Sequence, residues 1–346
     1  MENTTAGQTI LVTGGTGFVG AHTILQLLQK GYTVKTTIRS LERQNEVIDM
    51  LAAGGISNFD RLTFIEADLT KDASWDKAVQ NCDYVLHVAA PFPGGEPKDE
   101  NELIIPAKEG ALRVLKFARD AHVKRVVLTS SFAAIGYSID PRDHTFTEKD
   151  WTDPNAKIAA YIKSKTVAEL AAWEFMKREG GSLELTVINP VGIFGPVLGK
   201  DFSSSIQLVV RILSGKMPKI PKLHFGMVDV RDVADAHIRA MTHPNAAGQR
   251  FLIAADGSGS LPEITNILHA RYPDRHPPIS TQVLADWMVK LAAIFKPELK
   301  AVSTQLGPAK TLSNQKARSI LQWTPRKRGT TIEDTADSLL TFGIVK

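Results

Sequence analysis

The sequence has little cysteine and no long apolar run. Cys82 is the one cysteine among 346 residues, so no disulfide forms within the chain, as is typical of a reducing compartment. We expect Cys82 to be a buried, inert thiol. No run approaches the roughly 18 apolar residues that span a bilayer, and polar residues 1–8 do not resemble a signal peptide. The sequence therefore predicts a cytoplasmic protein without a membrane partner.

Concentrated charge and metal-ligand spacing are also missing. The net charge is +4, and the basic residues are scattered, the longest basic cluster being residues 326–328. Such a cluster is too short for a nucleic-acid-binding stripe. None of the nine histidines lies at metal-ligand spacing from cysteines or carboxylates. We therefore expect neither a nucleic-acid partner nor a metal site.

Short apolar runs alternate with amphipathic stretches through the first two thirds of the chain. Strands that alternate with helices build a parallel sheet covered on both faces. The pattern therefore predicts an α/β fold with a Rossmann-type, doubly wound parallel sheet. The expected strands are residues 9–12, 32–38, 61–66, 83–88, 125–129, 184–188 and 250–254, and the expected helices are residues 18–30, 72–80, 104–121, 160–178, 203–214 and 229–241.

A glycine-rich loop follows the first expected strand and opens the first expected helix. Glycine lets the backbone approach a pyrophosphate closely, and the N–H groups at a helix start bind its charge. This context favours a dinucleotide-binding loop over a glycine-rich turn without a ligand. The expected cofactor contacts in the loop are Gly14, Thr16, Gly17, Phe18, Val19 and Gly20.

The second expected strand lacks the acid that holds the ribose 2′-hydroxyl of NAD. Arg39 stands in its place, and Arg43 follows one turn later. A guanidinium pairs well with a 2′-phosphate, so we predict NADPH as the cofactor; the alternative is an ordinary exposed Arg39. His87, which ends the fourth strand, is expected to be a packed core histidine. Further expected cofactor contacts are Asp68, Leu69, Val88, Ala89, Ala90 and Thr129.

A tyrosine and a lysine four positions apart begin the expected helix 160–178. Tyr161 and Lys165 therefore share a helix face, whereas Lys163 faces away. A nearby ammonium lowers the pKa of a tyrosine, which can then exchange a proton with a carbonyl oxygen. Lys165 could also bind the nicotinamide ribose. An exposed Tyr–Lys pair is the alternative reading.

Hydroxyl side chains end the expected strand 125–129. Ser131, with Ser130 as the alternative, would hydrogen-bond a substrate carbonyl and place it beside the tyrosine. A serine cluster at a strand end is usually a turn or a cap. Its position thirty residues before Tyr161 favours a catalytic role for Ser131.

These motifs together resemble the extended short-chain dehydrogenase/reductase family, most closely its dihydroflavonol reductase-like branch of NADPH-dependent aldehyde, ketone and methylglyoxal reductases. The matching segments are residues 13–20, 128–131, 161–165, 189–196 and 228–234. The resemblance implies a catalytic triad of Ser131, Tyr161 and Lys165. It also implies cofactor contacts at Pro190, Val191 and Ile193.

Two segments depart from the plant members of this branch. Residues 155–160 lack the cinnamoyl-CoA reductase signature, and residues 132–134 lack the polar residue that dihydroflavonol reductases use for flavonoid hydroxyls. We therefore expect a general aldehyde, ketone or α-dicarbonyl substrate. The candidate pocket residues are Phe92, Phe132, Phe194 and His224; core packing of the phenylalanines and a surface position of His224 are the alternatives.

The predicted function is NADPH-dependent reduction of a carbonyl to the alcohol. A hydroxysteroid dehydrogenase or a nucleotide-sugar epimerase of the same superfamily is the alternative, although Arg39 argues against epimerases that retain NAD. A non-catalytic NADP-binding regulator is a third possibility, against which Tyr161 and Lys165 argue. The chain is expected to be a monomer, or a homodimer paired through helices 104–121 and 160–178.

Proline-rich, loop-rich sequence begins after Asn189, and residues 261–346 read as mostly helical. We predict that residues 1–190 form the NADP-binding domain, to which residues 226–255 cross back. Residues 191–225 and 256–346 are expected to form a smaller, mostly helical substrate-binding domain.

Overall fold

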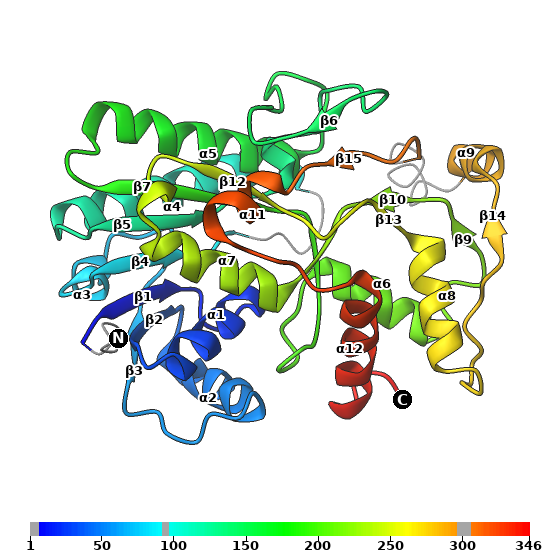
Figure 1. Ribbon diagram of the computed structural model, residues 1–346, viewed down its shortest axis with the longest axis horizontal. Coiled ribbons are helices and arrows are strands. Elements are labelled where there is room, and N and C mark those ends of the chain that lie inside the picture. The colour runs from blue at the N-terminus through cyan, green and yellow to red at the C-terminus, as the bar shows by residue number, and fades with distance from the viewer. Residues whose placement is uncertain (1–6, 92–96, 296–305) are drawn as a thin grey trace.

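The computed structural model describes residues 7–91, 97–295 and 306–346. Across these residues the core is a seven-stranded sheet in the order β12-β7-β5-β4-β1-β2-β3, and each neighbouring pair is parallel (Figure 1). This confirms the predicted Rossmann-type fold. The strands are β1 (Thr9–Thr13), β2 (Thr33–Ile38), β3 (Leu62–Glu66), β4 (Tyr84–His87), β5 (Arg125–Thr129), β7 (Glu184–Pro190) and β12 (Arg250–Ile253).

The central strands are apolar throughout because both faces of the sheet are covered. In β1, Ile10 and Val12 pack into one apolar core, and Leu11, which points the other way, packs into a second core. Alternate side chains of a strand point to opposite faces, so a strand that faces helices on both sides needs a continuous apolar run.

Helices cover the two faces (Figure 1). The first face carries α1 (Phe18–Gln29), α2 (Gln44–Ala53) and α7 (Val230–Thr242), and the second carries α3 (Trp75–Val79), α4 (Asn101–Asp120) and α5 (Ala160–Glu179). Of these helices, α2 was not predicted.

The cysteine lies in the core of the second face. Burial raises the pKa of the Cys82 thiol to about 11, which confirms the buried, inert cysteine.

A second lobe of the chain lies beside the carboxyl ends of the strands (Figure 1). Its helices surround a third apolar core, which contains Ile206, Leu268 and Leu339. Between its parts, α7 and β12 return to the sheet. The domain boundaries remain predictions. The helices of this part are α6 (Ser204–Leu213), α8 (Leu261–Arg271), α9 (Asp286–Phe295) and α12 (Arg328–Thr341), whereas α11 (Gln315–Leu321) packs into the first core beside α7 and β12.

Short paired strands connect segments that are distant in the chain. The pair β6–β15 joins the loop after β5 to the segment before α11. The pair β8–β11 leads the chain from the end of β7 toward α7. The short strands are β6 (Thr145–Phe146), β8 (Gly192–Phe194), β9 (Ile220–Pro221), β10 (His224–Phe225), β11 (Met227–Asp229), β13 (Gly259–Ser260), β14 (Val283–Leu284) and β15 (Thr311–Leu312).

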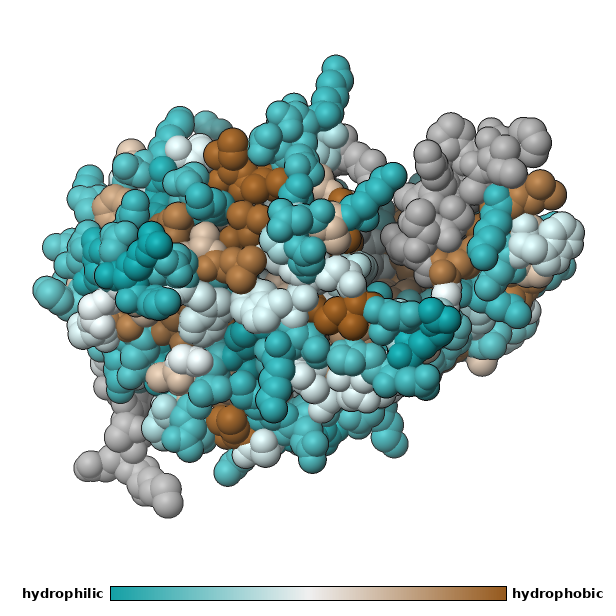
Figure 2. Space-filling model, turned by 90° about the horizontal axis from the view of Figure 1, so that it is seen from above, coloured by the Kyte–Doolittle hydropathy of each residue, from teal (hydrophilic) through white to brown (hydrophobic). Residues whose placement is uncertain are grey.

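The surface seen from above is mostly hydrophilic, with an apolar cluster on the side that α5 crosses (Figure 2). Ile105 of α4 and Leu170 of α5 are exposed large apolar side chains. Within the described segments, no helix has the length and apolar character needed to cross a membrane.

Candidate active site

The glycine-rich loop lies between β1 and α1. Gly14 has a φ of +77°, and a Cβ there would lie 3.0 Å from the Cβ of Ala89. A Cβ on Gly20 would lie 2.2 Å from the carbonyl oxygen of Gly14, so both positions require glycine. All of α1 is described, and its first turn holds neither an acidic residue nor a side-chain cap. Its N–H groups are therefore available to a bound anion.

Two arginines predicted to bind the cofactor have different surroundings. Arg39 follows β2, is exposed, and is close enough to Asp68 for its charge to act on that carboxylate. The pKa of Asp68 is lowered mainly by the Thr70 backbone N–H, which donates to it at 2.8 Å. Arg43 instead pairs with Glu46 at 2.7 Å. Arg39 therefore remains the better candidate for a 2′-phosphate, and a role for Arg43 would compete with its ion pair.

The Thr13 hydroxyl fixes the turn after β4. It accepts the N–H groups of Val88 and Ala89, both at 3.0 Å, and lies 2.8 Å from Nδ1 of His87. Because both acceptor positions of the hydroxyl are used, its proton goes to Nδ1, and neutral His87 carries its own proton on Nε2. Burial lowers the pKa of His87 to about 3. The packed core histidine is confirmed, and the turn holds Ala89 against the glycine loop.

The hydroxyls of Tyr161 and Ser131 meet near the carboxyl end of β5. Tyr161 lies in the first turn of α5, and its hydroxyl is hydrogen-bonded to the Ser131 side chain. Burial raises the pKa of Tyr161 above its ordinary value, and the bond to Ser131 opposes this effect. The expectation that Lys165 lowers this pKa is therefore wrong for the structure described, because desolvation dominates.

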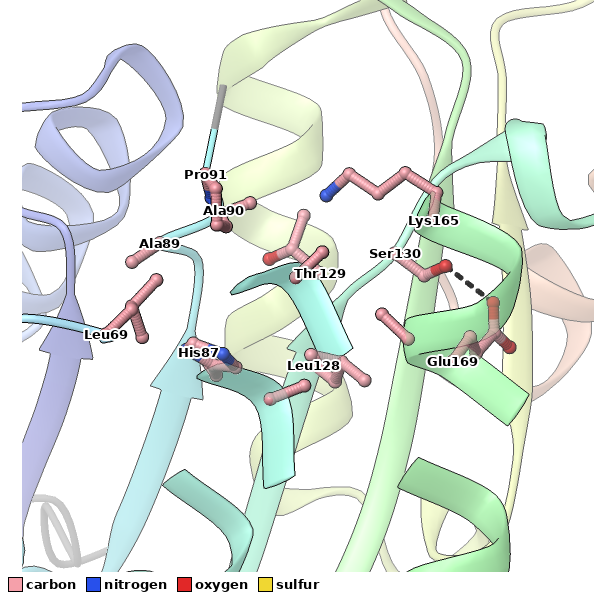
Figure 3. Close-up of a pocket in the computed structure, with 13 residues that line it drawn as sticks. Leu69, His87, Ala89, Ala90, Pro91, Leu128, Thr129, Ser130, Lys165 and Glu169 are labelled. Atoms are coloured by element: carbon pink, nitrogen blue, oxygen red, sulfur yellow. Dashed lines mark hydrogen bonds between the residues drawn. The ribbon is translucent and has the colours of Figure 1, made fainter. Parts of the chain in front are cut away.

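Lys165 extends from α5 across the ends of β4 and β5, and its amine points toward Thr129 and Ala90 (Figure 3). Burial lowers the pKa of Lys165 to about 8, against an opposing effect of the Glu169 carboxylate. Lys163 belongs to another face of the helix and pairs with Glu100, the N-cap residue of α4, at 2.6 Å.

The Thr129 hydroxyl is directed toward α7. It lies 2.7 Å from Nε2 of His237, whose Nδ1 lies 2.7 Å from the carbonyl oxygen of Val233. A carbonyl only accepts, so Nδ1 carries the proton and Nε2 accepts from Thr129. Burial lowers the pKa of His237 to about 4, so this chain of bonds stays neutral at physiological pH. His237 thus supports the end of β5, a role that the sequence did not reveal.

A buried carboxylate lies beneath the predicted catalytic residues. Glu169, one turn after Lys165, is 1% exposed. Its Oε2 accepts from the Ser130 hydroxyl at 2.5 Å and from the Asn189 side-chain amide at 2.7 Å. Its Oε1 accepts from Nε of Arg250 at 2.5 Å. Glu169 was not among the predicted site residues; the one available signal was its four-residue spacing from Lys165.

Glu169 also separates the roles of the two serines. The Ser130 hydroxyl is bound to Glu169 (Figure 3), whereas the Ser131 hydroxyl faces Tyr161. The Asn189 amide further donates to the carbonyl oxygen of Ser131 at 3.2 Å. The geometry thus favours Ser131 over Ser130 as the substrate-binding hydroxyl.

A pocket lies directly below this edge, between α4, α5 and the ends of β4 and β5 (Figure 3). Polar residues line it, namely His87 at the end of β4, Thr129 and Ser130 at and just after the end of β5, and Lys165 and Glu169 of α5. Ala107 and Ala111 of α4 close its other side. The site therefore combines a backbone anion cradle, a cationic amine and a pair of hydroxyls at one edge of the sheet.

Comparisons with known proteins place the chain in a family. The family model described as "NAD dependent epimerase/dehydratase family" matches residues 10–254. The chain belongs to this family. It is the extended short-chain dehydrogenase/reductase family that the motifs resemble, so that resemblance is confirmed.

Relatives within the epimerase/dehydratase family include several reductases. "Cinnamoyl-CoA reductase CAD2" of Medicago truncatula is 33% identical over 346 residues and covers 98% of each chain. "NADPH-dependent methylglyoxal reductase GRE2" of Saccharomyces cerevisiae is 32% identical over 360 residues, covering 96% of this chain and 98% of its own. The crystal structure of yeast methylglyoxal/isovaleraldehyde reductase Gre2 complexed with NADPH matches with a TM-score of 0.80 at 30% identity, over 97% of this chain and 99% of that one.

The predicted substrate residues of this family member do not all lie at the site. The Phe132 ring follows Ser131, and its centre is 5.5 Å from that of Phe146. Phe194 is 1% exposed and stacks on Phe225 in the third core. His224 is exposed on β10, and Phe92 lies outside the described residues. Pro190 and Val191 are buried at the end of β7, and Ile193 follows on β8; their cofactor contacts stay predictions.

Proposed function

We propose that this protein reduces an aldehyde, ketone or α-dicarbonyl to the alcohol with NADPH, and that Tyr161 donates the proton. The observation that carries the proposal is the contact between the Tyr161 and Ser131 hydroxyls. It lies at the sheet edge where the Lys165 amine also points. The printed activities of the relatives, reductases of methylglyoxal and of cinnamoyl-CoA, support a carbonyl substrate.

The residues around the glycine loop fit NADPH. The loop packs too tightly for a Cβ on Gly14 or Gly20, and this compact turn before the start of α1 suits a pyrophosphate. Arg39 suits a 2′-phosphate. Lys165 would hold the nicotinamide ribose. NADPH, when bound, supplies the hydride. The NADPH complex of yeast Gre2 supports this choice of cofactor.

The protein's own groups would bind the oxygen and deliver the proton. The Ser131 hydroxyl donates to the substrate carbonyl oxygen and holds it beside Tyr161. Tyr161 then gives its proton to that oxygen as negative charge develops on it. The raised pKa of Tyr161 keeps it protonated at neutral pH, which suits an acid in the reductive direction.

The first experiment compares NADPH with NADH oxidation over a panel of small aldehydes, α-dicarbonyls, β-keto esters, aryl ketones and steroid ketones. Tyr161→Phe should bind NADPH normally and lose roughly 10²–10⁴-fold in turnover, the usual contribution of a positioned acid. The matched control is Tyr84→Phe, because Tyr84 is buried at the amino end of β4, opposite the carboxyl ends where the site lies. Near-normal turnover by Tyr161→Phe would exclude the proposed role.

The same panel separates the alternatives. Turnover confined to steroid ketones would indicate a hydroxysteroid dehydrogenase. Tight NADPH binding without reduction of any carbonyl would favour a non-catalytic regulator. Bound NAD that is retained and not exchanged would favour an epimerase, against which Arg39 argues.

A further inference from the structure

A lysine from near the C-terminus lies over aromatic rings beside the catalytic serine. Nζ of Lys310 is 4.3 Å from the centre of the Tyr137 ring and 5.9 Å from that of the Phe132 ring. Phe132 directly follows Ser131, and Tyr137 is close enough to Tyr161 to act on its pKa. The ammonium therefore lies over two rings that adjoin the residues whose hydroxyls would hold the substrate oxygen.

The backbone around Lys310 is fixed by contacts. The Ser258 hydroxyl donates to the carbonyl oxygen of Lys310. The next two residues, Thr311–Leu312, form β15 and pair with β6. Phe146 of β6 packs edge-on against Phe132. A strand pairing and a ring contact thus connect Lys310 to the catalytic turn.

The charge of Lys310 has no carboxylate partner within the described segments. None of the ion pairs among residues 7–91, 97–295 and 306–346 includes it, and burial lowers its pKa. Lys316 makes a useful comparison, because its Nζ lies 5.3 Å from the Phe251 ring centre but Glu148 acts on its pKa. The ring faces compensate Lys310 only in part, so an anion would be favoured there.

We propose that Lys310 forms an anion subsite of the active site and that the preferred substrates are oxo acids. The substrate carboxylate would pair with Lys310 while the carbonyl oxygen lies at Ser131 and Tyr161. The rings of Phe132 and Tyr137 would contact the carbon chain. This inference rests on the proposed function and adds the charge of the substrate. A charge-assisted pair in a partly buried site is worth about tenfold in affinity.

Matched acids and esters test the subsite. The pairs are 2-oxobutanoate, acetoacetate and levulinate, each against its ethyl ester, so that the carboxylate lies at three distances from the carbonyl. In Lys310→Met the acid-to-ester ratio of kcat/KM should fall about tenfold for the best-fitting pair. Lys310→Arg should keep most of the wild-type ratio. Lys316→Met, which removes a similarly placed lysine, should leave the ratio unchanged. An unchanged ratio in Lys310→Met would overturn the inference.

A binding measurement separates this inference from the proposed function. Hexanoate and hexanamide are titrated by calorimetry into the protein saturated with NADP⁺. Hexanoate should bind about tenfold more tightly, and Lys310→Met should abolish the difference. If that preference is found but no carbonyl is reduced, the subsite stands and the reductase proposal fails. If carbonyls are reduced but neither preference depends on Lys310, the subsite is refuted.

Discussion

Glu169→Gln should lower the free energy of unfolding substantially. The carboxylate is buried and accepts hydrogen bonds from Ser130, Asn189, Arg250 and Trp173. Glutamine has nearly the same shape but no charge, and one of its two terminal atoms is a donor. In every orientation that donor would face another donor. The substitution therefore removes the charge pair and at least one of the hydrogen bonds without opening a cavity.

The size of the loss follows from what Arg250 would retain. Removing one partner of a buried ion pair costs about 3–5 kcal/mol, because the remaining charge stays buried. Nη1 of Arg250 would still donate to the carbonyl oxygens of Glu148 and Asp150, at 2.8 and 3.0 Å. The centre of the Trp151 ring lies 3.5 Å from its guanidinium carbon. We therefore expect a loss near the lower limit, about 3 kcal/mol.

Equilibrium urea unfolding followed by circular dichroism measures this loss. The matched control is Glu184→Gln, whose carboxylate pairs with the buried Arg125 at 2.6 Å but is 36% exposed. Arg125 also donates to the carbonyl oxygens of Ala240 and His243, so the control should lose less, about 1 kcal/mol. A loss in Glu169→Gln that is no larger than in the control would refute the reasoning.

Three further predictions concern the cofactor site. Arg39→Ser should reduce the preference for NADPH over NADH, measured as a ratio of kcat/KM values, by about 10–100-fold; an unchanged ratio would remove Arg39 from the 2′-phosphate site. NADPH affinity, measured by fluorescence titration, should weaken as the pH rises through about 8, because the Lys165 ammonium loses its proton there. Lys165→Arg stays charged and should lack that step, and a flat wild-type profile would contradict the assignment. Gly20→Ala would place a Cβ 2.2 Å from the Gly14 carbonyl oxygen and should weaken NADPH binding at least roughly tenfold, whereas normal binding would argue against the cradle.

Much of the fold could be predicted because its signals are local. Continuous apolar runs between turn residues mark β1, β4 and β5, and each was expected within about two residues of its observed bounds. The missed helix α2 is short, with ten residues. Its buried stripe consists of Val47, Met50 and Leu51 alone, too few residues for a clear helical period.

The site was predictable where its residues are neighbours in the chain. The glycine loop and the Tyr161–Lys165 spacing belong to single turns or helices. Glu169 and Arg250 are 81 positions apart and meet only because β12 pairs with β7. Lys310 reaches the site through a similar long-range pairing. Contacts of this kind depend on tertiary arrangement, which residue spacing does not encode.

The position of β12 in the chain also affects how the protein forms during synthesis. The first six strands of the sheet precede residue 191, but the guanidinium that pairs with Glu169 is made only after α6 and α7. A nascent chain that ends before Arg250 would hold an uncompensated carboxylate beneath α5. We expect such a chain to remain sensitive to protease at α5 and to bind NADPH weakly. A cofactor-competent sheet would therefore form only after α6, the first helix of the second lobe, has been made.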